Sequence, residues 1–393
     1  MQKHATTDGP AGESLEGSES LAFRPSPDNT IGVELELQII DPQTGDLAAG
    51  AVRILKVCQE EGLNDVTAEL MQSMIELKTG ICQNATEAKQ QLTPLLRRVR
   101  NIASSLGYQL AFGGTHPFSR GVVGAVSPGE RYERIQNRLA WITYQRLVFG
   151  MHVHVGVPSG DIAMGVTSML VQYLPHLLAL SASSPFWQGE DTGLASCRTA
   201  LYRMLPHAGV PRYFRNWKEF RTFYRVMRDA QSVESPKDIY WDIRPCPSLG
   251  TIEFRICDMP ATPSIAWGLA ALIQCLVKST QRLLHERPHL CRGDIRRHWV
   301  ALENKWLATR YGLGAVHIRT PSGKRGLLSQ DVVDLVDQMK PIAEETGDAA
   351  LLGAVRPIKG YESAADRQRR IFRDNGDWKA LVGDMSTRWA EEL

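Results

Sequence analysis

Residues 32–38 read Gly32-Val33-Glu34-Leu35-Glu36-Leu37-Gln38, and this strict alternation of apolar and polar side chains is typical of a β-strand. Successive side chains of a strand point to opposite faces of its sheet. One face of this strand would therefore be apolar, while the other would carry the carboxylates of Glu34 and Glu36. Two carboxylates side by side repel each other, so they need a cation between them or open water around them.

The same alternation returns in two later segments with different polar pairs. Met151-His152-Val153-His154-Val155 would present two imidazoles on one face. Thr251-Ile252-Glu253-Phe254-Arg255-Ile256 would present Glu253 beside Arg255. Two more glutamates, Glu69 and Glu76, flank a loop that leads into another strand-like stretch. Several strands with one apolar face and one face of metal-type ligands predict the floor of an active site.

The donor set indicates which metal such a floor would hold. Hard cations such as Mg²⁺ and Mn²⁺ take oxygen ligands and leave positions open for substrate phosphates, whereas zinc sites more often use cysteine or several histidines. The chain has neither a GxxxxGK[ST] phosphate loop nor a GxGxxG motif after a strand, so bound ATP would rely on metals and arginines. Four arginines lie near the suspected floor and could stabilise charge in phosphoryl transfer: Arg198, Arg203, Arg244 and Arg255.

Each of these signals has a purely structural alternative that the sequence leaves open. Glu34 and Glu36 could face water on a solvated sheet. His152 and His154 could belong to a half-exposed strand, and Glu253 with Arg255 could form a structural ion pair. The functional interpretation depends on the agreement of several segments on one chemistry.

Composition restricts the class of protein. The 393 residues carry a formal net charge of +2, which is too balanced to indicate nucleic acid as the main partner. Seven cysteines without a CxxC pair argue against a zinc ribbon or a disulfide framework and predict a reducing cytoplasm. The apolar stretches 166–180 and 265–284 contain polar residues, so they predict buried helices and no membrane partner.

The order of elements predicts an α+β fold with an antiparallel or mixed sheet, helices on one face and polar residues on the other. Residues 1–28 are rich in Gly, Ser, Glu, Thr and Pro and predict a disordered leader. Strands are expected at 31–40, 75–79, 108–113, 152–157 and 251–257. Helices are expected at 86–106, 131–144, 165–182, 217–228 and 264–285, with a helical tail at 295–311, 329–346, 364–375 and 377–393.

Motifs in a fixed order resemble a known family from Thr30 to Leu393, most densely up to Pro260. The chain is similar to the type 2 glutamate–cysteine ligases, specifically their bacterial carboxylate–amine ligase branch. The motifs are Gly32-Val33-Glu34-Leu35-Glu36, Gly113-Gly114-Thr115-His116-Pro117-Phe118, Gly150-Met151-His152-Val153-His154-Val155-Gly156, Ser184-Pro185-Phe186-Trp187-Gln188-Gly189, Asp191-Thr192-Gly193-Leu194-Ala195-Ser196 with Arg198, Trp241-Asp242-Ile243-Arg244-Pro245, and Gly250-Thr251-Ile252-Glu253-Phe254-Arg255.

The resemblance implies a glutamine-synthetase-like fold, in which a curved antiparallel sheet forms an open funnel with helices packed behind it. Residues 29–393 would form a single catalytic domain with a helical C-terminal part, and a homo-oligomer, with the dimer as the expected form. An acid would take the γ-phosphoryl group of ATP to give an acyl phosphate, and an amine would then form the amide. In the family's namesake reaction the acid is glutamate-like and the amine cysteine-like, and the expected activity here is weak.

The resemblance also implies roles for individual residues. Arg255 would meet the transferring phosphate, and Arg198 would hold the acid or the acyl phosphate. Arg198, Arg244 and Arg255 would bind ATP. The implied Mg²⁺ (or Mn²⁺) ligands are Glu34, Glu36, Glu69, Glu76, His152 and Glu253.

Two alternative functions stay open on the same scaffold. A phosphotransferase of the guanidino-kinase type would release a phosphorylated product and no amide. A non-catalytic ATP- or metal-binding protein would bind nucleotide without turnover.

Overall fold

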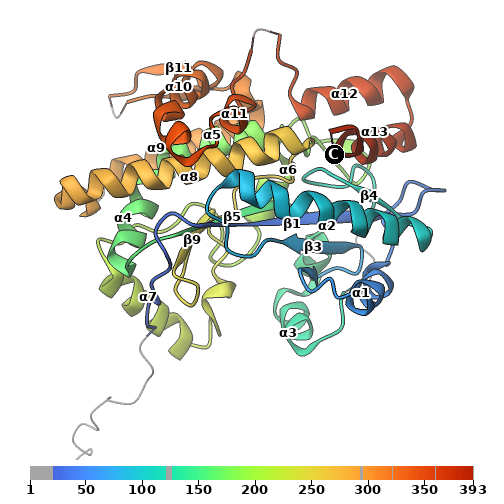
Figure 1. Ribbon diagram of the computed structural model, residues 1–393, viewed down its shortest axis with the longest axis horizontal. Coiled ribbons are helices and arrows are strands. Elements are labelled where there is room, and N and C mark those ends of the chain that lie inside the picture. The colour runs from blue at the N-terminus through green and yellow to red at the C-terminus, as the bar shows by residue number, and fades with distance from the viewer. Residues whose placement is uncertain (1–20, 121–125, 293–294, 321, 359, 393) are drawn as a thin grey trace, which may run out of the picture.

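A computed structural model describes residues 21–120, 126–292, 295–320, 322–358 and 360–392, and its centre is one antiparallel sheet (Figure 1). The strand order is β2-β3-β1-β5-β9-β8, and β4 pairs with the far end of β1. The strands are β1 (Ile31–Ile40), β2 (Val66–Ala68), β3 (Met74–Lys78), β4 (Gln109–Ala111), β5 (Met151–Gly156), β8 (Ile243–Cys246) and β9 (Thr251–Phe254). Two small hairpins lie outside it: β6 (Phe186–Trp187) with β7 (Glu190–Asp191), and β10 (Val316–Ile318) with β11 (Arg325–Leu327).

The apolar face of the sheet forms the main core. Val33, Leu35 and Leu37 on β1 are at most 1 % exposed, as the alternation predicts, and they share one cluster with Val153 and Phe254. Helix α2 (Ala85–Ser105) and helix α8 (Pro263–Glu286) contribute to this cluster and cover that face. In Figure 1 they run along the upper side of the sheet, with the other helices of the tail above α8. The opposite face is thereby left for the polar side chains.

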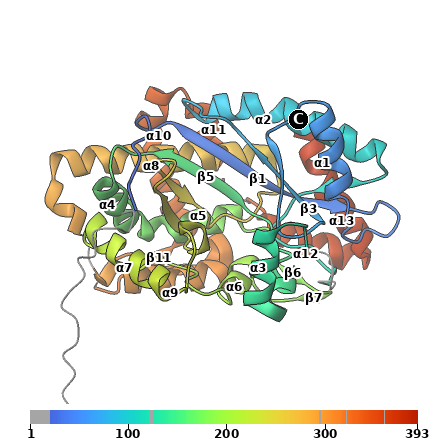
Figure 2. The same cartoon turned by 90° about the horizontal axis from the view of Figure 1, so that it is seen from below.

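The remaining helices flank this core, as the second view shows (Figure 2). They are α1 (Ala51–Glu60), α3 (Glu130–Leu139), α4 (Gly160–Leu170), α5 (Leu174–Ser181), α6 (Cys197–Tyr202), α7 (Trp217–Asp229), α9 (Ile295–Tyr311), α10 (Leu328–Thr346), α11 (Ala349–Gly353), α12 (Ala364–Asn375) and α13 (Trp378–Glu392). Short 3₁₀ turns occupy Ala140–Gln145, Val171–Tyr173, Pro236–Asp238, Pro288–Arg292 and Gly312–Gly314. The expected α+β architecture and all five expected strands are confirmed, with boundary shifts of one to a few residues.

The apolar stretch 166–180 lies inside the protein. One helical run, Gly160–Ser181, is long and apolar enough to cross a membrane, but 78 % of its apolar window is buried within the fold. Helix α8, which contains the second stretch, also packs in the main core. The prediction of buried helices is therefore confirmed for both stretches.

The predicted leader is only partly within the described residues. Residues 1–20 lie outside them, whereas residues 21–28 pass along the turn between β8 and β9. The Arg24 amide donates to the Pro247 carbonyl at 2.9 Å, and a Cβ on Gly250 would lie 2.0 Å from the Arg24 carbonyl oxygen. The chain can pass this closely because Gly250 has no side chain. Residues 21–28 therefore pack against the fold, which differs from the disorder that was expected for them. The predicted single domain over 29–393 stays a prediction.

Candidate active site

The polar face of the sheet forms the floor of a cavity of about 480 Å³. Strand register brings its side chains together: Glu34 lies opposite Lys78 on β3 and opposite His152 on β5, while Glu253 lies opposite His154 and Arg244. All six predicted metal ligands line this cavity. Sequence segments more than 200 residues apart therefore meet on one surface.

Two groups of side chains on the floor have the spacing of a metal site. Glu36, Glu76 and His152 form one group, and Glu34, His152 and Glu253 form the other, with the ligand atoms of each group within 4.8 Å of one another. His152 joins the two groups because its Nδ1 lies 3.1 Å from a Glu34 oxygen and its Nε2 lies 3.7 Å from a Glu36 oxygen. Glu69 also lines the cavity, but it does not belong to either group.

The electrostatics of these carboxylates are suited to a bound cation. Burial and the neighbouring carboxylate of Glu69 raise the pKa of Glu36 to about 7. Burial and three neighbouring glutamates also raise the pKa of Glu76 well above its ordinary value. Carboxylates that resist ionisation in this way gain most from a divalent cation between them.

His152 supplies a second observation in favour of a metal. Burial and the nearby Arg255 guanidinium lower the pKa of His152 to about 4, so the imidazole is neutral at physiological pH. Its buried Nε2 has no hydrogen-bond partner among the described residues. A neutral imidazole with an unpartnered nitrogen beside carboxylates is suited to bind a divalent cation. Oxygen ligands with one imidazole fit Mg²⁺ or Mn²⁺.

Glu253 is held in place by two arginines. It is 1 % exposed, and Arg244 donates to its Oε2 through Nε at 2.9 Å and through Nη2 at 2.6 Å. Arg255 donates from Nη1 to the other oxygen and from Nη2 to the Tyr202 hydroxyl at 3.1 Å. Although burial opposes ionisation, these two guanidinium groups lower the pKa of Glu253 well below its ordinary value. Glu253 therefore forms the ion pair with Arg255 that the sequence left open, and its role as a metal ligand stays a prediction.

The four arginines named from the sequence occupy different positions. Arg255 lines the cavity, as predicted. Arg244 also lines it, but its Nη1 donates to the Lys237 and Ile239 carbonyls at 3.0 and 3.2 Å, so its donors are largely committed to Glu253 and the backbone. Arg244 thus holds Glu253 in place and has few donors left for a bound phosphate. Arg203 is exposed and does not line the cavity.

Arg198 differs from the expectation of a substrate-binding residue. Its side chain is 3 % exposed and does not line the cavity. It donates to the carbonyls of Ile256 and Arg255 at 3.3 and 3.1 Å, where it fills space that the absent side chain of Gly150 leaves open. In this position Arg198 fixes the backbone that carries Arg255, and its contact with the acid or the acyl phosphate stays a prediction. The motif around it gave no sign of this orientation.

The sequence reasoning missed a cationic wall of the cavity. Arg146 lines the cavity with Tyr202 and Tyr240, and its guanidinium lies 6.0 and 5.4 Å from the centres of their rings. Its buried Nε and Nη1 have no hydrogen-bond partner within the described part of the chain. Two buried guanidinium nitrogens without partners are costly, and a bound anion would relieve that cost. The only sign of this role in the sequence is that Arg146 is basic. It follows a 3₁₀ turn, residues 140–145, that carries no recognisable motif.

Comparisons with known proteins agree over almost the whole chain. The profile of the family described as Glutamate–cysteine ligase family 2 (GCS2) matches residues 30–387. Relatives from Gloeobacter violaceus and Thermobifida fusca, both named "Putative glutamate–cysteine ligase 2", are each 38 % identical to this chain. The first alignment covers 93 % of this chain and 98 % of the relative, and the second covers 92 % and 91 %.

A solved structure has a similar fold. The glutamate–cysteine ligase of Francisella tularensis in complex with AMP superposes with a TM-score of 0.66 at 12 % identity, over 94 % of this chain and 90 % of that one. At this identity the likeness shows the fold alone. The expected glutamine-synthetase-like fold is confirmed.

Proposed function

The chain belongs to glutamate–cysteine ligase family 2, and from that premise we propose that it is an ATP-dependent carboxylate–amine ligase. The observation that carries the proposal is that two metal-type groups meet Arg244 and Arg255 on one sheet face. A divalent cation bound there would neutralise phosphate charge, so that an anionic acid can approach ATP. Glu34, Glu36, Glu76, His152 and Glu253 would hold Mg²⁺ or Mn²⁺, and Glu69 lies near enough to assist.

In the first step, an oxygen of the acid carboxylate attacks the γ-phosphorus of ATP and ADP leaves. This turns a poor electrophile into an acyl phosphate. Arg255 is the protein's own charged group at this point, because its guanidinium faces the cavity and can stabilise the charge on the transferring phosphoryl group. Arg146 would bind an anionic group of the acid on the opposite wall, which accounts for its unpartnered donors.

In the second step, the amine nitrogen attacks the acyl carbon, phosphate leaves, and the nitrogen loses a proton to give the amide. The protein needs no covalent nucleophile for this sequence. Its contribution is to orient both substrates and to exclude water, which would otherwise hydrolyse the acyl phosphate.

The finer assignments follow from the family. The proposed acid is glutamate-like and the proposed amine cysteine-like, because the named relatives carry the glutamate–cysteine ligase description. A cytoplasmic location, a homodimer and a single catalytic domain are part of the same proposal.

The test is to incubate metal-free protein, restored with Mg²⁺, with ATP and a pooled panel of amino acids and amines. ADP and new product masses are read together. We expect ADP release that requires both an acid and an amine, with an amide mass that appears only in the presence of ATP. A variant with Glu34 changed to Gln, assayed in parallel, controls for contaminating ATPases.

Other outcomes separate the alternative functions. ADP with a phosphorylated acceptor, seen by phosphorus NMR, would favour the phosphotransferase. Nucleotide binding without ADP release across the panel would favour the non-catalytic protein. Wild-type turnover in the Glu34→Gln variant would overturn the metal-site assignment.

A further inference from the structure

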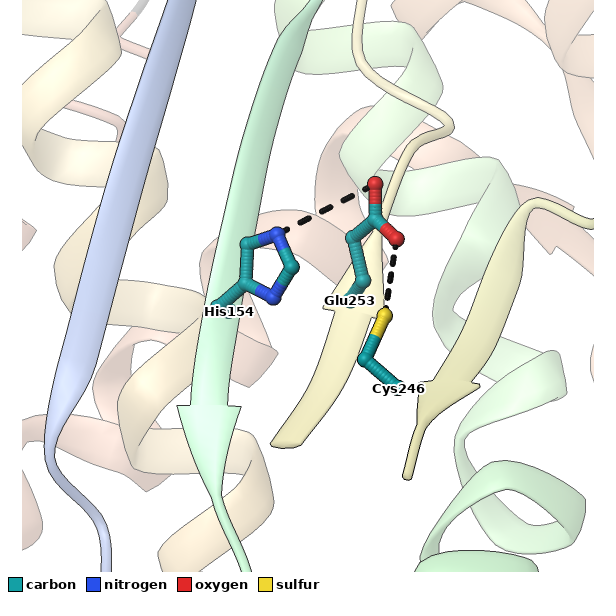
Figure 3. A group of neighbouring side chains, drawn as sticks. All are labelled: His154, Cys246 and Glu253. Carbon is teal, nitrogen blue, oxygen red and sulfur yellow. Dashed lines mark hydrogen bonds and ion pairs between the residues drawn. The ribbon is translucent and has the colours of Figure 1, made fainter. Parts of the chain in front are cut away.

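A third cluster on the same face has a different donor set (Figure 3). His154, Cys246 and Glu253 place an imidazole nitrogen, a thiol sulfur and a carboxylate oxygen within 4.8 Å of one another. The Cys246 sulfur lies 3.1 Å from Glu253 Oε2, and His154 Nε2 lies 3.9 Å from Glu253 Oε1. Neither His154 nor Cys246 belongs to the predicted magnesium ligands.

Strand pairing explains why these three side chains meet. His154 on β5 lies directly opposite Glu253 on β9, and Cys246 on β8 lies opposite Thr251, two residues from Glu253 on the same face. Figure 3 shows His154 and Cys246 pointing toward Glu253 from the two neighbouring strands. All three line the cavity, so an ion could reach them from its mouth.

The hydrogen bonds of the cluster direct His154 Nε2 toward the carboxylates, while Glu253 Oε2 accepts from Arg244 and Glu253 Oε1 accepts from Arg255. His154 Nδ1 lies 2.9 Å from the Thr251 hydroxyl, which orients the ring with Nε2 toward the carboxylates. A Glu34 oxygen lies 3.4 Å from that Nε2 and could complete the set. The thiolate and Glu34 would add negative charge that offsets Arg244 and Arg255, the two cations already bound to Glu253.

We propose that His154, Cys246 and Glu253, with Glu34 or water as fourth ligand, form a site for a soft divalent cation, Zn²⁺. Thiolate, imidazole and carboxylate are ordinary zinc ligands, and magnesium does not take thiolate. Zinc in this site draws Glu253 away from the Glu34–His152–Glu253 group. Zinc is therefore an inhibitor of the magnesium-dependent reaction, and this functional part rests on the proposed ligase.

The binding test does not depend on any activity. Metal-free protein is titrated with CoCl₂, which reports thiolate ligation by a charge-transfer band in the near ultraviolet. Zn²⁺ affinity is then measured by competition with a chromophoric chelator. We expect a thiolate band that saturates at one equivalent of thiolate-bound metal per chain. In Cys246→Ser the band should be absent and the zinc affinity at least about 100-fold lower.

The control is Cys58→Ser, which removes a buried thiol from α1, outside the cavity. It should keep the thiolate band and the affinity of the wild type, and circular dichroism confirms that both variants are folded. His154→Gln should weaken zinc binding as Cys246→Ser does. Zinc binding that is equal in Cys246→Ser and wild type, or a cobalt complex without the thiolate band, would overturn the site.

The functional arm compares zinc inhibition of ADP formation in wild type and Cys246→Ser, each relative to its own zinc-free rate at millimolar Mg²⁺. We expect half-inhibition at a zinc concentration at least about 10-fold lower in the wild type. Equal sensitivity of the two proteins, with the binding result positive, would overturn the inhibitory role alone. If the protein has no ligase activity, the proposed function is wrong. The cobalt and zinc titrations still test the metal site, because they do not depend on activity.

Discussion

Glu36 shows how a single buried carboxylate can serve function at the expense of stability. The pKa of this group is raised from 4.5 to about 7, so between these values the folded protein holds a proton that the unfolded chain has lost. The free energy of unfolding therefore falls as pH rises through this window, by roughly 3 kcal/mol for a shift of this size. Glu36→Gln removes the titrating charge. It keeps a side-chain oxygen that can accept the hydrogen bond that the Gly150 amide now donates to Glu36.

We expect metal-free Glu36→Gln to be more stable than the wild type at pH 8, by about 1 to 3 kcal/mol, and to show no gain at pH 4.5. ADP formation should fall at least about 100-fold, because a metal ligand is lost. Urea unfolding at both pH values measures the first effect. Glu60→Gln, an exposed carboxylate on α1, is the charge-matched control. A variant less stable than the wild type at pH 8 would contradict the cation-site interpretation.

Arg146 tests the proposed recognition of an anionic acid. Arg146→Lys keeps the positive charge but loses the planar fork that pairs with a carboxylate and stacks between Tyr202 and Tyr240. We expect the KM for the acid to rise about 10- to 100-fold, with the KM for ATP changed much less. Steady-state kinetics with each substrate varied in turn measure this.

The matched control is Arg97→Lys on the exposed face of α2, which should leave all constants unchanged. A larger effect on the KM for ATP than on that for the acid would place Arg146 at the nucleotide instead.

His116 provides a pH effect away from the cavity. Burial lowers its pKa to about 4, its Nε2 donates to the Gly45 carbonyl at 2.9 Å, and its Nδ1 accepts from the Ser119 amide at 3.0 Å. Only the neutral ring satisfies both bonds. The unfolded chain protonates His116 at higher pH than the folded protein does. The contribution of His116 to the free energy of unfolding is therefore complete above pH 6.5 and is lost as pH falls toward 4.

We expect the His116→Asn variant, which cannot titrate, to be less stable than the wild type at pH 7. The difference between the two proteins should shrink by up to about 3 kcal/mol by pH 4. Urea unfolding at pH 7, 5.5 and 4 measures the difference. A difference independent of pH would show that His116 does not carry the expected linkage.

At the scale of elements, helix α2 illustrates a start that sequence predicts well. Asn84 caps it: its side-chain oxygen accepts from the Glu87 amide at 2.9 Å, and its Nδ2 donates to the Thr346 carbonyl at 2.8 Å. Asn84→Ala should cost about 1 to 2 kcal/mol of stability. Because α2 packs on the face opposite the cavity, kcat and KM should stay within about two-fold. Lys89→Ala, on the exposed surface of α2, is the control and should cost less than about 0.5 kcal/mol.

Some elements could not be predicted from the sequence, and the reasons are physical. Strand β8 is only four residues long and contains Pro245, which argues against a strand, but β8 is the edge of the sheet where proline is tolerated. The expected helix 165–182 is two helices, α4 and α5, with a 3₁₀ turn between them and Pro175 in the first turn of α5. Helix α1 begins after Gly50, which offers no side-chain cap.

The part of the candidate site that depends on alternating side chains and strand pairing could be predicted from the sequence. Alternation alone put Glu34, Glu36, His152 and Glu253 on polar faces, and pairing then brought them together. The orientation of Arg198 and the approach of Arg146 depend on long-range packing against Gly150 and the tyrosines. No local pattern encodes such contacts, so sequence alone predicts neither the buried setting of Arg198 nor the position of Arg146 in the cavity wall.

At the scale of the whole molecule, the proposed metal ligands join strands β1, β3, β5 and β9, which are far apart in the sequence. Cations bound between them should act as cross-links of the sheet. A ligand that binds only the folded state adds stability that grows with its concentration, by about 2.7 kcal/mol at 100 times its Kd. Mg²⁺ with ADP should therefore raise the Tm of the wild type, and EDTA should reverse the change.

This stabilisation should be local as well as global. We expect hydrogen exchange to slow most in β1, β3, β5 and β9 when Mg²⁺ and ADP are added, and least in α12 and α13, which pack with each other beyond the cavity. Glu36→Gln should reduce both the Tm shift and the protection, whereas Glu60→Gln should retain them. If instead protection spread evenly over the chain, or appeared equally in Glu36→Gln, the carboxylates of the sheet would not be the ligands. The cation would then bind elsewhere, and the sheet face would be a solvated polar surface despite its buried, unpartnered groups.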